Sequence, residues 1–141
     1  SQADVPIQLH VEENGPQTNA ELASICDRSG MVRQRAVHHY APANVSESFT
    51  HGLSASVSMG KESISAIMDS YLHCSSTWTM ETDYLDDPRR PGAVLGPKTV
   101  PKRTQKLASV LLDNVDKNQA EDLLNHIHSI WPSALYGEID P

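Results

Sequence analysis

The sequence predicts an α+β or mainly α protein with about four helices, a few short strands and a C-terminal helical hairpin. Three observations support this prediction. Apolar residues recur at the spacing of amphipathic helices in the second half of the chain. In the first half, apolar and polar residues alternate over short runs. Prolines concentrate in residues 85–101. We therefore expect a mixed α/β core in residues 1–84, a proline-rich basic linker or long loop in 85–101, and the hairpin with a tail in 102–141.

The first third of the chain contains a predicted strand and a predicted helix. Apolar residues alternate with polar ones over 7–11, as in a half-buried strand. We expect Thr18 or Asn19 to cap a helix that runs to about Arg28, because a side-chain oxygen at this position accepts hydrogen bonds from the first free backbone N–H groups. Gly30 would close this helix.

The middle of the chain contains two predicted strands and one predicted helix. Residues 31–40 fit helical spacing and strand alternation alike, so their structure stays open. Apolar residues that alternate with serine predict a strand with one apolar face over 51–59, and the β-branched and aromatic residues of 76–82 predict another. Between these two segments, a helical stripe is formed by Ile64, Ile67, Met68, Tyr71 and Leu72.

Two amphipathic helices are predicted after the linker. Pro101 is tolerated in the first turn of the earlier helix, where its missing N–H has no partner to lose. Asp116 and Gln119 have the spacing of a capping box at the start of the later helix, and Pro132 is expected to stop it. A short turn between them makes the pair a helical hairpin.

The apolar stripes of this hairpin need a surface, because short helices gain most of their stability by packing an apolar face. Two alternatives remain open: the stripes dock on a partner protein or a second copy, or they complete the core of the same chain. In the first case Trp131 is the expected anchor. The predicted interface residues are Leu107, Leu111, Leu123, Leu124, Ile127 and Trp131.

Charge and composition narrow the function classes. The net charge of −7 opposes non-specific attraction to nucleic acid or to an anionic membrane. The sequence contains no apolar run long enough to span a bilayer, and its first residues lack the features of a signal peptide, so we expect no membrane association. Two cysteines, Cys26 and Cys74, favour reduced thiols in an intracellular protein, cytoplasmic or nuclear.

A basic segment crosses the linker and the start of the hairpin. Its two clusters resemble a bipartite nuclear localisation signal, in which an extended segment binds an import receptor. Alternatively, the segment is a solvated linker whose positive charges balance the negative charges of the acidic residues before it. A third possibility is that it binds nucleic acid through phosphate contacts. Its residues are Arg89, Arg90, Lys98, Lys102, Arg103 and Lys106.

Ser58 and Lys61 have the S-x-x-K spacing of serine β-lactamases, where the lysine lies one helical turn from the nucleophile. The chain has neither of the accompanying S-D-N and K-T-G motifs. We therefore prefer to interpret Ser58 as the N-cap of the following helix, with a small hydrolase as a remote alternative.

The seven histidines do not show the close spacing of a zinc site. His126 and His128 would diverge on a helix and could not share a metal ion. A site assembled from the distant residues His39, His73 and Cys74 stays open. We predict no cofactor and no metal.

The sequence thus favours a non-enzymatic protein-interaction or oligomerisation module of an intracellular regulatory or structural protein, with a nuclear or viral setting. The first alternative is a nucleic-acid-binding protein that uses residues 89–106. The second is a small hydrolase that uses Ser58 and Lys61.

Overall fold

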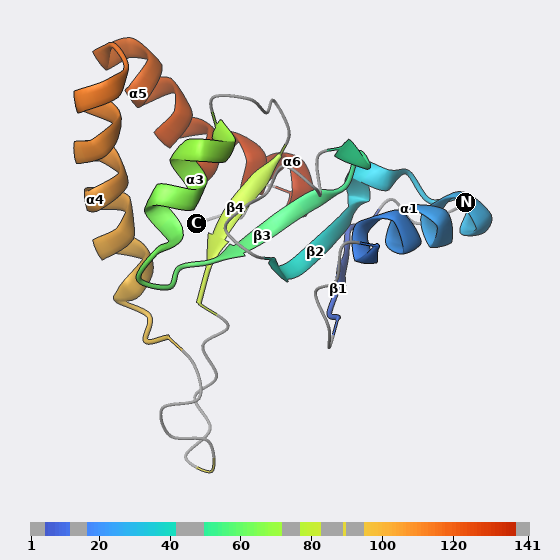
Figure 1. Cartoon of the computed structure of the whole chain (residues 1–141). Coiled ribbons are helices and arrows are strands. Elements are labelled where there is room, and N and C mark those ends of the chain that lie inside the picture. Colours follow the sequence, from blue (N-terminus) through green and yellow to red (C-terminus); the bar gives the residue numbers. More distant parts are fainter. Residues whose placement is uncertain are drawn as a thin grey trace.

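The computed structural model describes residues 5–11, 17–41, 50–71, 77–82, 89 and 95–137. Helices surround a small parallel sheet, so the predicted α+β content is confirmed at this level (Figure 1). The predictions for Leu72, His73, Cys74, Arg90 and most of the linker lie outside the described residues. In chain order the elements are β1 (Ile7–Leu9), α1 (Thr18–Ser29), the 3-10 helix η1 (Arg33–Arg35), β2 (Ala36–Ala41), β3 (Ser54–Ser58), α3 (Ser63–Tyr71), β4 (Trp78–Glu81), α4 (Thr99–Asn114), α5 (Lys117–Asn125), the π-helical segment η2 (His126–Ile130) and α6 (Trp131–Tyr136).

The described strands form one sheet in the order β1-β2-β3-β4, with every neighbouring pair parallel. Ile7 pairs with Ala36 across β1 and β2, and the β3–β4 register runs to the pair Ser58 and Glu81. The register between β2 and β3 shifts between His38 and Ala41. Because all strands run the same way, their carboxyl ends meet at one edge of the sheet. We call this edge the carboxyl edge.

Helices cover both faces of the sheet. α1 and α3 lie on one face, and α6 lies on the opposite face (Figure 1). The C-terminal segment is held there by polar contacts: the Gln8 amide donates to the Tyr136 hydroxyl at 3.1 Å, and Arg35 donates to the carbonyl oxygen of Ala134 at 2.9 Å. The central strand β3 is therefore buried on both faces, including its serines.

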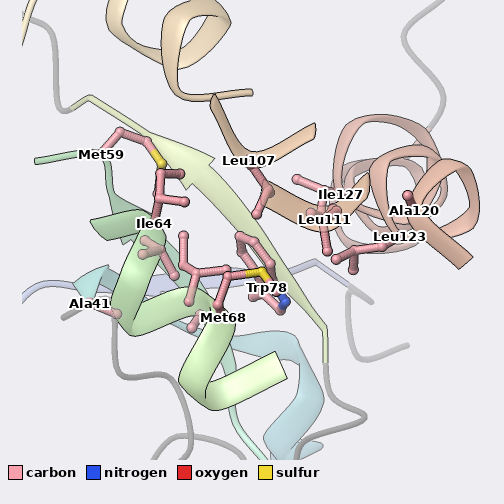
Figure 2. Close-up of a cluster of buried hydrophobic side chains, with 13 residues drawn as sticks. Ala41, Met59, Ile64, Met68, Trp78, Leu107, Leu111, Ala120, Leu123 and Ile127 are labelled. Atoms are coloured by element: carbon pink, nitrogen blue, oxygen red, sulfur yellow. The ribbon is translucent and has the colours of Figure 1, made fainter. Parts of the chain in front are cut away.

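One hydrophobic core joins the first half of the chain to the C-terminal helices. Side chains from β3, β4 and α3 meet α4, α5 and η2 in a single buried cluster (Figure 2). Trp78 of β4 also contacts the ring of Trp131, with ring centroids 6.0 Å apart. A second, smaller cluster packs α1 on β2 and consists of Leu22, Cys26, Ala36 and Leu53.

Several local predictions are confirmed. Gly30 ends α1 with φ of 70°, and its N–H donates to the carbonyl oxygens of Asp27 and Cys26. Pro101 lies in the first turn of α4. The capping box of α5 forms: the Gln119 N–H donates to the Asp116 carboxylate at 3.0 Å, and the Asp116 N–H donates to the Gln119 side chain at 3.4 Å.

Two helix-end predictions are wrong. The N-cap of α1 is Gln17, whose side chain makes no capping hydrogen bond, whereas Thr18 and Asn19 are the first two residues of the helix and Asn19 bonds a buried histidine. Pro132 does not stop the last helix, since the chain passes through the π-helical segment η2 and restarts as α6 with Pro132 in its first turn. The N–H of Trp131 donates to the carbonyl oxygen of His126 in a π-type hydrogen bond, so the irregular pattern directly precedes the proline.

Candidate functional site at the carboxyl edge of the sheet

The most unusual polar contact among the described residues spans β3 near the carboxyl edge. Nδ1 of His39, on β2, lies 2.8 Å from Oε2 of Glu81, the last residue of β4. The two side chains are only 17% and 13% exposed. The contact becomes an ion pair when the imidazole is protonated.

The small side chains of β3 make this contact possible. β3 lies between β2 and β4, so His39 and Glu81 have to meet above it. On that face β3 presents Ser56 and Ser58, and Ser58 is directly in register with Glu81. A larger residue at either position would fill the space that the imidazole and the carboxylate share.

His10 extends the cluster to a third strand. It follows β1, and its ring centroid lies 5.5 Å from that of His39. Unlike His39 it is exposed. The carboxyl edge thus combines an exposed imidazole, a half-buried imidazole and a carboxylate, which are the residue types that transfer protons in enzymes.

His38 lies next to His39 but faces the other side of the sheet, as strand alternation requires. Its Nδ1 lies 2.9 Å from Oδ1 of Asn19 in the first turn of α1. Burial, and to a smaller extent the neighbouring His39, lowers the pKa of His38. The adjacent imidazoles therefore work in different surroundings.

The structure places the predicted interface residues against the chain's own sheet. Leu107 and Leu111 are 0% exposed, and Leu123 and Ile127 are 3% and 1% exposed. Leu124 and Trp131 are half-buried and pack against the same cluster. This placement favours the alternative in which the stripes complete the core, because a partner could reach the four buried side chains only if the helices left the sheet.

The predicted basic patch is divided by the fold. Lys102, Arg103 and Lys106 lie on the helix α4, so they do not form the extended segment that an import receptor binds. Nε of Arg103 donates to the carbonyl oxygens of Met59 and Gly60, at 3.3 and 3.0 Å, which fixes this cation to the loop after β3. Arg89 is exposed and Arg90 lies outside the described residues. Lys98, which precedes α4, and Lys102 and Lys106 on that helix are exposed at four-residue spacing.

The S-x-x-K pair does not have the predicted geometry. Ser58 is the last residue of β3, and α3 begins only at Ser63, so Ser58 is not its N-cap. Lys61 is exposed in the turn between them, so it does not lie one helical turn after Ser58. The Ser63 hydroxyl instead donates to the carbonyl oxygen of Gly60 at 2.8 Å, which closes this turn.

The C-terminal histidines contact different elements. Nδ1 of His126 lies 2.8 Å from the carbonyl oxygen of Asp122, whereas Nε2 of His128 lies 3.0 Å from the Thr104 hydroxyl. Burial lowers the pKa of His128. Within the described part of the chain, no three His, Cys, Asp or Glu side chains are placed to hold a metal ion. Over the same residues, no helix is both long and apolar enough to cross a membrane.

Comparison with known proteins gives one informative match. The chain is 32% identical over 101 residues to the uncharacterized protein MJ1127 of Methanocaldococcus jannaschii. The match covers 72% of this chain but only 34% of the archaeal protein, so the chain spans about a third of that relative. No family model and no solved structure matches the chain significantly.

The sequence indicated only part of the carboxyl-edge cluster. His39 is among the histidines considered for a distributed site, and it contacts Glu81, which that prediction did not include; residues 73 and 74 lie outside the described residues. A usable signal existed, since His10 and Glu81 stand at the ends of predicted strands and His39 lies in the segment of open assignment. What was missing was the strand order that brings them together.

Proposed function

We propose that this domain binds a small polar ligand at the carboxyl edge of its sheet, with His39 and Glu81 as a proton-transfer pair. The observation that supports the proposal is the 2.8 Å contact between these two side chains across β3. In parallel sheets with flanking helices, ligands bind outside the carboxyl ends of the strands. His10 supplies an exposed imidazole at the same place.

Stability alone explains this contact poorly. Removing a carboxylate and an imidazolium from water has a desolvation cost that offsets much of their attraction, so a largely buried pair contributes little net stability. Apolar residues at both positions would pack the sheet as well. Carboxylate and imidazole groups are instead the common proton-transfer groups of functional sites.

A binding screen tests the proposal. Amide chemical shifts of the uniformly labelled chain would be recorded with mixtures of phosphorylated, carboxylated and hydroxylated metabolites. We expect hits that move the signals of His10, His39 and Glu81, and that lose binding in Glu81→Gln. Glu121→Gln removes an exposed carboxylate from the pair with Lys117 and serves as the matched control. Hits that move only signals elsewhere in the chain would contradict the proposal.

A second proposal keeps the predicted association but moves it to the β1 edge of the sheet. Four large apolar side chains with 46% to 63% exposure lie on or beside β1 and α1. β1 is also an edge strand, whose outward backbone groups can pair with another strand. We propose a second copy as the occupant, because the same edge on both copies gives a closed two-fold contact. The four residues are Val5, Ile7, Ile25 and Val32.

Light scattering tests this association. The proposal predicts a mass above the 15.5 kDa of one chain at high concentration. Ile7→Lys should return the monomer, whereas Leu112→Lys, at an exposed leucine on α4, should not. A monomer at every concentration would remove self-association.

We also propose that α4 and α5 act together as the predicted helical hairpin, with the sheet as their docking surface. Only Val115 and Asp116 connect them, and the capping box fixes the start of α5. Their buried residues belong to the cluster that includes β3, β4 and α3. Comparing the stabilities of Leu111→Ala and Leu112→Ala tests this role.

A further inference from the structure

Nε2 of His38, on β2, is a buried nitrogen without a hydrogen-bond partner among the residues that the structure describes. The His38 side chain is 1% exposed. The other ring nitrogen, Nδ1, is held by Oδ1 of Asn19, which is itself 6% exposed. Unpaired buried polar atoms are rare in folded proteins, and each one calls for a ligand, a water molecule or a functional reason.

The partner of Nδ1 determines what Nε2 can bind. An amide oxygen only accepts hydrogen bonds, so Nδ1 carries the proton. In the neutral ring, Nε2 then presents a lone pair and accepts. Burial lowers the pKa of His38, which keeps the ring in this neutral form at neutral pH. Nε2 of His38 can therefore accept a hydrogen bond from a donor group.

The location connects this acceptor to the proposed site. Asn19 lies in the first turn of α1, the helix that follows β1, and His38 precedes His39 on β2. In parallel α/β units the region between a strand end and the next helix N-terminus is where ligands sit. His38 therefore lies beside this region on the α1 face of β2, whereas His39 lies on the opposite face of the same strand.

We infer that Nε2 of His38 accepts a hydrogen bond from a hydroxyl group of the ligand, so that the site takes polyhydroxylated compounds such as sugars. This inference rests on the proposed function and extends it by a ligand class. A carboxylate at neutral pH only accepts hydrogen bonds, so it does not match a bare imidazole nitrogen. An ammonium group would donate, but its burial beside a neutral ring carries a large desolvation cost.

Nitrogen NMR of the histidine rings tests the inference, with D-ribose and acetate as probes. In the free protein we expect His38 with a protonated Nδ1 and an unprotonated Nε2. D-ribose should shift the Nε2 resonance of His38, and acetate, which has no donor at neutral pH, should not. The response should disappear in Asn19→Ala, which releases the ring, and persist in His128→Gln, which changes a histidine on η2 that contacts α4.

The outcomes separate this inference from the proposed function. A protonated Nε2 in the free protein, or a long-lived internal water bound to it, would overturn the inference. A ribose response at His39 and Glu81 without one at His38 would also overturn it, while leaving the proposed function in place. If D-ribose moves none of these residues although the metabolite screen gives hits at His39, the hydroxyl assignment is wrong and the site binds another class.

Discussion

Two neighbouring leucines of α4 provide a sharp test of how the C-terminal helices are used. Leu111 is 0% exposed in the main core, and Leu112, the next residue, is 56% exposed. Truncation of a buried leucine to alanine removes packing and leaves a cavity, which costs about 3 kcal/mol in typical cores. The same change at an exposed helical site alters stability by less than about 0.5 kcal/mol. Leu111→Ala and Leu112→Ala thus form a matched pair.

Urea denaturation followed by circular dichroism measures both variants. We expect equal m values for the two proteins and a much lower midpoint for Leu111→Ala, because the m value reports the surface exposed on unfolding. In a chain of this size, a loss of about 3 kcal/mol lowers the Tm by roughly 9 °C. Equal stabilities for the two variants would refute the assignment of α4 to the chain's own core. They would restore the hypothesis that this stripe is a partner surface.

Four further outcomes follow. Asp116→Ala should cost about 1 kcal/mol in the same urea assay, because the capping box of α5 loses its acceptor; an unchanged midpoint would contradict the cap. Cys26, buried and with its pKa raised by that burial, should react with a thiol reagent only as fast as the protein opens; rapid labelling of this thiol in the native state would contradict its burial. The pKa of His38 is lower in the folded chain than in the unfolded chain, where it is about 6.5. The contribution of His38 to the free energy of unfolding should therefore be fully present above pH 6.5 and be lost as the pH falls from 6.5 toward the folded pKa. A His38→Gln variant whose stability falls with the same slope in this pH range would contradict the assignment to His38. The affinity for duplex DNA, measured by fluorescence anisotropy, should fall with salt, with a slope of log K against log salt concentration no steeper than about −3. This value corresponds to three phosphate contacts, by the exposed lysines at 98, 102 and 106. A steeper slope would reveal a larger basic surface.

Local structure was well predicted where neighbouring residues determine it. The apolar stripe of α4 and the capping box at Asp116 depend on contacts three or four residues apart, and both formed as expected. Gly30 behaved likewise, since its left-handed conformation needs no distant partner. The prediction for Pro132 failed because it assumed a regular α-helix, whereas η2 changes the hydrogen-bond pattern just before the proline.

The sheet was harder to predict because parallel pairing is non-local. Serines that alternate with apolar residues indicate a strand with one polar, solvent-facing side. In β3, however, Ser54 and Ser56 are 1% and 3% exposed, because helices cover both faces of the sheet. Ser54 keeps a partner there by donating to the carbonyl oxygen of Gln34 at 2.8 Å. The candidate site depends on the same pairing, since His39 and Glu81 meet only when β3 lies between their strands.

The most direct test of the proposed site is the metabolite screen repeated on Glu81→Gln. This substitution keeps the shape of the side chain and removes the charge beside His39. We predict that compounds which shift the signals of His10 and His39 in the unmodified chain lose their affinity for the variant, while its melting temperature stays nearly the same. Undiminished binding by Glu81→Gln would contradict the role of the pair, and a loss of folding in place of a loss of binding would assign the contact to stability.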